Sequence, residues 1–192
     1  MTRSLTEVIT DGGVAVVGTD TVYGVCVDAA NAAAVERLLA LKRRPQGKPA
    51  AVSFEAVEDA LVALPELGER TRAAVVALLP GPLTLLVPNP RKRFPLAGGE
   101  LLGMRVLALG AGRPLLLTSA NLAGGPEART LEEVDPQLRA GADLVLDGGQ
   151  LPGTPSTVVD LSALERGGHW RVVRDGAFSG EQLERALLGS RL

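Results

Sequence analysis

The sequence predicts an α/β fold (α+β in strict usage), in which helices pack on the faces of a mixed sheet. Short apolar runs rich in β-branched residues recur along the chain, and helical stretches with an apolar stripe lie between them. The two kinds of segment do not alternate strictly, which favours a mixed sheet over a purely parallel one. With 192 residues, 46% of them hydrophobic, the chain can bury its own core as a single domain over residues 1–192.

Caps and breakers place the elements of the N-terminal half. Ser4 can cap a short helix that runs to about Thr10, and the apolar run at residues 14–17 predicts a buried strand. Asn31 can cap a second helix, which stops before Arg44 because the residue before a proline avoids the α region. The other elements expected in this half are a strand at residues 50–54 and helices near 55–63 and 68–79.

The C-terminal half begins at the Pro-Gly-Pro break of residues 80–82. Strands are expected at residues 83–87, 104–109, 114–118, 143–146, 157–160 and 170–173, with helices near 131–139 and from Ser179 to 188. Only residues 110–113 separate the second and third of these strands, and a parallel crossover needs a dozen or more residues. These two strands are therefore either antiparallel neighbours or joined along a different local path.

Charge and rare residue types exclude several classes of protein. A formal net charge of −2 argues against a general nucleic-acid coat, so any basic surface must be local. Cys26 is the only cysteine, which excludes an internal disulfide, and His169 is the only histidine; we interpret both as structural. No apolar run reaches transmembrane length and no signal core is present, so we expect a soluble cytoplasmic protein with no membrane partner.

Two segments carry the strongest functional signal. Residues 18–24 read Gly-Thr-Asp-Thr-Val-Tyr-Gly, a run of hydroxyl residues directly after an apolar strand. Residues 42–49 read Lys-Arg-Arg-Pro-Gln-Gly-Lys-Pro, and they contain two of the three lysines of the chain. Arginine offers a planar fork to phosphate oxygens, and lysine offers a mobile point charge. The pair indicates a site for a polyanion and a small polar substrate, such as a nucleotide triphosphate and an amino acid.

Seven motifs occur in one order: TDTVYG, KRRPQGKP, PGPLTLLV, GMR, TSAN, PSTVVDL and VVRDG. From about Val14 to Gly176, this order resembles the YrdC-like family of threonylcarbamoyl-AMP synthases. The resemblance implies a YrdC-like twisted mixed parallel/antiparallel sheet in the short, single-domain form. It also implies a nucleotidyltransferase that condenses L-threonine, bicarbonate and ATP into threonylcarbamoyl-AMP with release of pyrophosphate. The product would serve the N6-threonylcarbamoyladenosine modification of tRNA, reached directly or through a separate threonylcarbamoyl-transfer complex.

The resemblance also assigns roles to individual residues. It implies catalytic roles for Lys42 and Arg44, ATP contacts by Arg44, Lys48, Asn121 and Arg174, and threonine contacts by Thr21, Arg105, Ser119 and Ser156. No metal site of the protein's own is implied, and Mg²⁺ would accompany ATP with phosphate oxygens and water as ligands. The residues themselves give a separate argument for Arg105, because an arginine within an apolar strand is costly to bury unpaired and should face a pocket. We expect Tyr23, the only tyrosine, at the pocket wall.

Three positions depart from the family pattern, and two of them, Ser53 and Leu101, keep a non-catalytic function open. Ser53 stands where many relatives have a histidine, Leu101 where many have a threonine, and Pro155 where a glutamate is common. One alternative is an RNA-binding module that uses Arg43 and residues 91–93, although the low pI and the scarcity of aromatic residues count against it. The other is a non-catalytic regulator of the same fold that binds a nucleotide or threonine.

Overall fold

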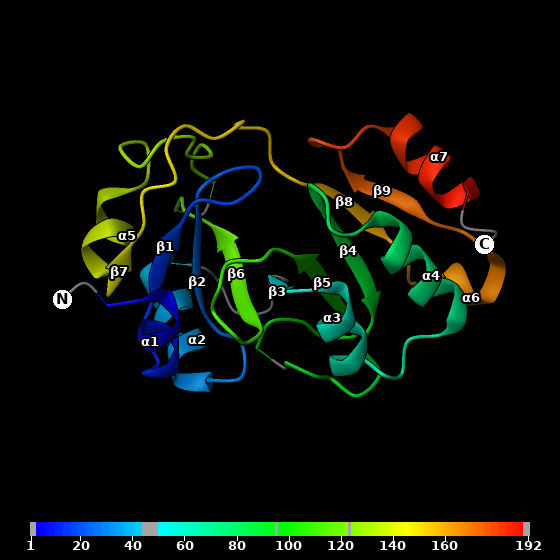
Figure 1. Cartoon of the computed structure of the whole chain (residues 1–192), viewed down its shortest axis with the longest axis horizontal. Helices are drawn as coiled ribbons and strands as arrows, with labels where there is room; N and C mark the ends of the chain where they lie inside the picture. The colour runs from blue at the N-terminus through cyan, green and yellow to red at the C-terminus, as the bar shows by residue number, and fades with distance from the viewer. Residues whose placement is uncertain (1–2, 44–49, 95, 123, 190–192) are drawn as a thin grey trace.

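The computed structural model describes residues 3–43, 50–94, 96–122 and 124–189. Its strands are β1 (Ala15–Val17), β2 (Gly24–Asp28), β3 (Ala51–Phe54), β4 (Leu83–Pro88), β5 (Leu101–Val106), β6 (Leu115–Ser119), β7 (Leu144–Val145), β8 (Thr157–Asp160) and β9 (Arg171–Arg174). Its helices are α1 (Leu5–Thr10), α2 (Ala32–Leu41), α3 (Val57–Ala63), α4 (Glu69–Leu78), α5 (Pro136–Gly141), α6 (Leu164–Gly167) and α7 (Gly180–Gly189). Within these residues all the strands belong to one sheet, in the order β7-β1-β2-β6-β3-β5-β4-β8-β9 (Figure 1).

The sheet is mixed, as the sequence predicts. The pairs β1–β7, β3–β5 and β4–β8 are parallel, and the other neighbouring pairs are antiparallel. Strand β3 lies between β5 and β6, so these two strands are not neighbours. Of the two possibilities that the short connection left open, antiparallel neighbours or a different local path, the structure shows the different path. The short segment that joins them passes the end of β3, where Leu107 N–H donates to Phe54 O at 2.8 Å and Glu55 accepts the N–H groups of Gly110 and Ala111.

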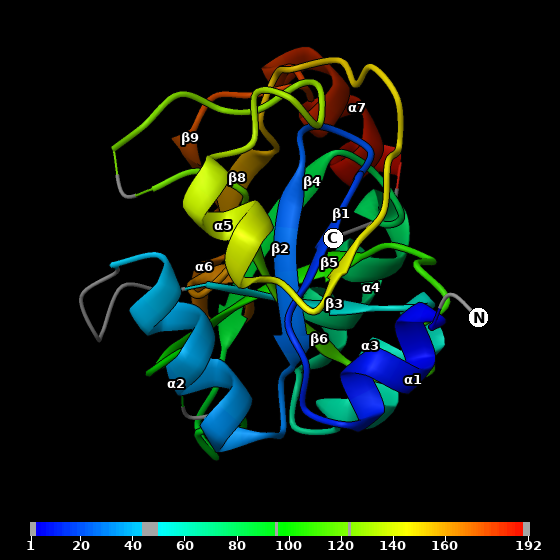
Figure 2. The same cartoon turned by 90° about the vertical axis from the view of Figure 1, so that its left-hand side faces the viewer.

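Local capping explains where the first two helices begin. Ser4 Oγ accepts the N–H of Glu7, and the Glu7 carboxylate accepts the N–H of Ser4 at 2.7 Å, which completes a capping box. Asn31 caps α2 through a bond from Ala34 N–H. These two helices lie on opposite sides of the β1–β2 pair (Figure 2), so both faces of this part of the sheet are covered.

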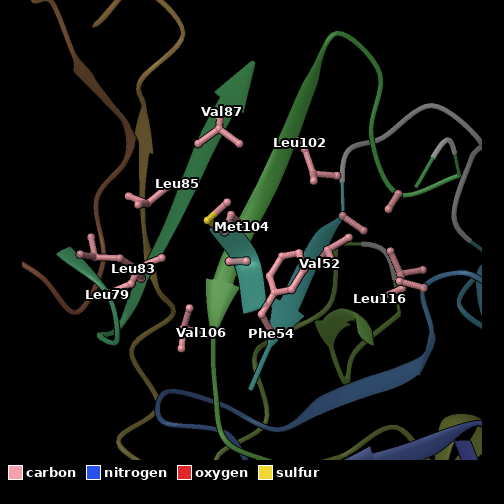
Figure 3. Close-up of a cluster of buried hydrophobic side chains, with 14 of the residues drawn as sticks. Val52, Phe54, Leu79, Leu83, Leu85, Val87, Leu102, Met104, Val106 and Leu116 are labelled. Atoms are coloured by element: carbon pink, nitrogen blue, oxygen red, sulfur yellow. The ribbon is translucent and has the colours of Figure 1, made fainter. Parts of the chain in front are cut away.

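Side chains alternate between the two faces of the central strands, as the pleat requires. Val52 and Phe54 point into the larger apolar core together with Met104 of β5 and Leu85 of β4 (Figure 3). The intervening side chains of β3 and β5 lie on the other face, where the pocket described below forms. The apolar face thus anchors the strands that hold the polar site.

Several predicted boundaries are wrong. Strand β2 and the single-turn helix α6 have no counterpart in the prediction. Strand β5 begins at Leu101 rather than at residue 104, because Leu101 already pairs with Pro88 of β4. Helix α5 begins at Pro136 rather than near residue 131, because Asp135 accepts the N–H of Gln137 and Pro136 occupies the first turn.

Candidate functional site

A pocket of about 340 Å³ lies on the polar face of the sheet, within the size range of small-molecule sites. Its walls come from the loop between β1 and β2, from strands β2, β3, β4, β5, β6, β8 and β9, and from the segments after β6 and before β8. Two glycines keep the floor open. A Cβ at Gly24 would lie 2.7 Å from Leu117 Cδ1, and a Cβ at Gly103 would lie 3.3 Å from the carbonyl oxygen of Ala50.

Arg105 of β5 lines this pocket with a side chain that is only 9% exposed. Its Nη2 donates to Asp20 Oδ1 at 2.5 Å, whereas its Nε is buried and has no acceptor among the described residues. Burial lowers the pKa of Arg105, Asp20 opposes that shift, and the nearby Arg174 adds to it. The group stays charged because an arginine pKa begins far above neutrality, so it can bind an anion.

A second polar cluster forms where β4, β8 and β9 meet. Ser156 Oγ lies 2.8 Å from Thr84 Oγ1, and Arg174 donates to the Ser156 carbonyl oxygen at 2.7 Å and to its hydroxyl at 3.2 Å. The cluster holds the Arg174 guanidinium at the pocket although the residue as a whole is exposed. Two arginines from neighbouring parts of the sheet therefore reach one cavity.

A third group closes the end of β6. Ser119 lines the pocket and donates to Asn121 Oδ1 at 2.8 Å, while Asn121 Nδ2 donates to Gly125 O at 2.7 Å. The Lys42 ammonium donates to the carbonyl oxygens of Ser119 and Asn121, and the lysine is 2% exposed. Lys42 therefore ties the end of α2 to this turn, and neither Lys42 nor Asn121 is among the described residues that line the pocket.

The hydroxyl segment forms a compact turn beside Arg105. Thr19 Oγ1 accepts the N–H groups of Thr21 and Val22 and donates to Val22 O at 2.7 Å. Thr21 lines the pocket from this turn. Tyr23 also lines the pocket, as predicted, but its hydroxyl contacts the loop after β7, where Asp147 Oδ1 lies at 2.9 Å.

The structure thus brings together five of the predicted contact residues, namely Thr21, Arg105, Ser119, Ser156 and Arg174. Arg44 and Lys48 lie outside the described residues, so their roles stay predictions. Arg43 is exposed and donates to Gln137 Oε1 at 3.1 Å.

The three residues that depart from the family pattern lie at different places relative to the pocket. Pro155 lines it, and Leu101 does not. Ser53 pairs with Arg105 across the parallel β3–β5 ladder, and its buried hydroxyl has no hydrogen-bond partner in the described part of the chain. The polar floor beside Arg105 is therefore less fully bonded than the rest of the site.

Three residues of the site were missed by the sequence reasoning. Asp20 pairs with Arg105, while Thr84 and Glu127 line the pocket. A carboxylate within a run of hydroxyls could have indicated Asp20, and a threonine within an apolar strand could have indicated Thr84. Glu127 follows a glycine-rich loop and carries no comparable signal in the sequence.

None of the helices among the described residues combines the length and the apolar character that a bilayer span needs. No group of three or more His, Cys, Asp or Glu side chains in that part of the chain is arranged to hold a metal ion.

Relatives of known sequence share most of the chain. A threonylcarbamoyl-AMP synthase of Stenotrophomonas maltophilia is 37% identical over 149 residues, which are 71% of this chain and 80% of that protein. A protein of the same name from Xanthomonas euvesicatoria is 39% identical over 153 residues, or 73% of this chain and 81% of that protein.

Solved structures share the fold. P. abyssi Sua5 complexed with L-threonine superimposes with a TM-score of 0.81 and 27% identity, over 94% of this chain and 55% of that longer one. E. coli YciO superimposes with a TM-score of 0.75 and 25% identity, over 93% of this chain and 90% of that one. The family model that joins Sua5, YciO and YrdC, described as "Telomere recombination", matches residues 7–176. With most of its length matched and its sheet superimposed on those of two members, the chain belongs to the Sua5–YciO–YrdC family.

Proposed function

We propose that the protein is a threonylcarbamoyl-AMP synthase, which condenses L-threonine, bicarbonate and ATP into threonylcarbamoyl-AMP and releases pyrophosphate. One observation carries the proposal: a single pocket joins two arginines to hydroxyls from separate strands and a turn. The relatives named threonylcarbamoyl-AMP synthase and the threonine complex of P. abyssi Sua5 support this assignment.

Threonine would occupy the part of the pocket around Arg105. The guanidinium would bind the threonine carboxylate, and the hydroxyls of Thr21 and Ser119 would bind its polar groups. Ser156 is buried at 4% exposure and bonded to both Thr84 and Arg174, so it can hold its hydroxyl in a fixed direction. Hydroxyls held in place by their neighbours lose little entropy when a ligand binds.

ATP would extend from Arg174 towards the turn at Asn121, with Arg44 and Lys48 contributing phosphate contacts as the sequence predicts. The described residues offer no metal site of their own, so Mg²⁺ would enter on the phosphate oxygens of ATP. The ion would neutralise phosphate charge, and the protein's part would be to bind and orient the triphosphate.

The reaction divides into two bond changes. The threonine amine attacks the carbon of bicarbonate, an N–C bond forms, and water leaves to give a carbamate. A carbamate oxygen then attacks the α-phosphorus of ATP, and the bond to the β-phosphate breaks with release of pyrophosphate. Both steps need alignment above all, and one pocket that holds both substrates supplies it. We place the reaction in the cytoplasm, before transfer of the group to tRNA.

Pyrophosphate release by the purified protein tests the proposal. We expect release only when ATP, L-threonine and bicarbonate are all present, without tRNA, and we expect less with L-serine because it lacks one methyl contact. Release that ignores threonine would indicate a plain ATPase. Release that requires tRNA would place the chemistry on RNA instead.

The RNA-binding alternative has weaker support. Arg93 donates to Glu66 at 2.9 Å, and Lys92 lies 3.6 Å from Glu100, so two of the three cations of residues 91–93 already have acidic partners. A phosphate-binding patch would have to break these pairs. The two arginines of the pocket are therefore a better-supported anion-binding site than residues 91–93.

A further inference from the structure

Arg105 and Asp20 form an ion pair beside the pocket. Asp20 stands in the hydroxyl turn and reaches Arg105 Nη2 at 2.5 Å. The two side chains differ in accessibility, because that of Arg105 is 9% exposed and that of Asp20 is 28% exposed. The buried cation therefore has a partly exposed partner, which does not itself line the pocket but stands between two residues that do, Thr19 and Thr21.

The charges around the pocket favour a zwitterion over a simple anion. Among the described residues, Arg105, Arg174 and Glu127 line the pocket, and Asp20 pairs with Arg105 from the turn beside it, so two guanidiniums face two carboxylates. Glu127 Oε2 is buried without a hydrogen-bond partner in this part of the chain. A ligand that brought only a negative charge to Arg105 would place it against Asp20, and like charges at this distance repel. An α-amino acid carries its two charges on neighbouring atoms, so its carboxylate can meet Arg105 while its ammonium meets Asp20.

Arg105 has the donors for such an arrangement. A guanidinium carries five N–H groups in a fixed fork, and Asp20 accepts from Nη2. The Nε of Arg105 has no acceptor among the described residues. The ligand carboxylate therefore need not displace Asp20 completely from the arginine.

We propose that Asp20 is a specificity-determining residue that binds the α-ammonium of the amino-acid substrate while Arg105 binds its carboxylate. This inference rests on the proposed function and deepens it: the site selects free α-amino acids, and it rejects analogues that lack the amine. By holding the ammonium, Asp20 also sets the position of the nitrogen, which forms the new N–C bond after the ammonium has released one proton to solvent.

The test compares two ligands on three proteins by calorimetry. The ligands are L-threonine and 2,3-dihydroxybutyrate, in which a hydroxyl replaces the ammonium. The proteins are the wild type, Asp20→Asn and Glu127→Gln, which neutralises the competing candidate for the ammonium, the carboxylate that lines the pocket. A charge-assisted hydrogen bond predicts that the wild type prefers threonine by about 10- to 150-fold. Asp20→Asn should reduce this preference to a few-fold, and Glu127→Gln should keep it.

Four results would overturn the proposal. The first three are a wild type that binds the two ligands equally, an Asp20→Asn variant that keeps the full preference, and a Glu127→Gln variant that alone loses it. Tighter threonine binding by Asp20→Asn would also overturn it, because Asp20 would then only compete with the substrate. The wild-type comparison needs no variant, so it remains decisive if Asp20→Asn does not fold.

The pyrophosphate assay separates this inference from the proposed function. Threonine binding with the predicted preference but without pyrophosphate release would contradict the proposed synthase activity and still support the role of Asp20. Pyrophosphate release together with an unchanged preference in Asp20→Asn would support the synthase and overturn the role of Asp20.

Discussion

Replacing Tyr23 with phenylalanine removes one oxygen atom from the centre of a hydrogen-bond network. The side chain is fully buried, and its hydroxyl lies 2.9 Å from both Asp147 Oδ1 and Gly149 O, which can share its proton. The same hydroxyl accepts the N–H of Gly148 at 2.8 Å. Tyr23→Phe should therefore release the loop after β7 and leave the apolar packing of the ring in place.

The cost follows from these contacts. Asp147 and Gly148 are exposed, so water can replace the lost hydroxyl and the full penalty for burying unpaired groups does not apply. One donated and one accepted hydrogen bond, at a net value of about 0.5–1.5 kcal/mol each, give a loss of about 1–3 kcal/mol in the free energy of unfolding. For a domain of this size, the melting temperature should fall by roughly 2–12 °C.

A spectroscopic titration checks the same network independently. Burial and the hydrogen bond to Asp147 raise the pKa of Tyr23 above its ordinary value. A raised folded-state pKa gives stability that is present below about pH 10 and lost as the pH rises through the folded-state value. Because the chain has a single tyrosine, phenolate absorbance reports on Tyr23 alone, and its midpoint should be higher in the native protein than in urea.

The control for this titration is Asp147→Asn, which keeps an acceptor oxygen but removes the charge. It should lower the Tyr23 midpoint and cost less stability than Tyr23→Phe. A native midpoint equal to that in urea, together with an unchanged melting temperature for Tyr23→Phe, would refute the reasoning.

Two further predictions concern other charged groups. The Arg37 guanidinium holds the pKa of Asp143 below its ordinary value, helped by the N–H of Val14 at 2.8 Å. The resulting stability is present above about pH 4 and lost as the pH falls through the lower folded-state pKa, so urea midpoints of wild type and Asp143→Asn should converge in acid. Lys42→Met should destabilise the fold by about 1.5–3 kcal/mol, because two carbonyl oxygens lose a charged donor, and it should reduce pyrophosphate release more than the exposed neighbour change Arg43→Ala. Equal effects of the two variants on activity would contradict a part for Lys42 in positioning the turn after β6.

Much of the fold could be predicted because its signals are local. Ser4 and Asn31 begin their helices as expected, and β8 has the predicted bounds. Strand β2 was missed because its apolar run, Val25 to Val27, is only three residues long and lies between Gly24 and Asp28. The path from β5 to β6 depends on β3 inserting between them, which is a pairing between distant segments and leaves no local pattern.

The site shows the same division between local and long-range information. Arg105 could be predicted to face a pocket, because the cost of burying an unpaired guanidinium depends only on its apolar strand. Its internal partner could not, because Asp20 and Arg105 meet only after the turn between β1 and β2 folds over β5. Because an unpaired buried guanidinium is costly, Arg105 also needs a partner when no ligand is bound. The chain supplies that partner itself in Asp20. A buried cation in a strand therefore predicts an acidic partner, which in this protein is Asp20, and the carboxylate of the proposed substrate would have to bind Arg105 beside it.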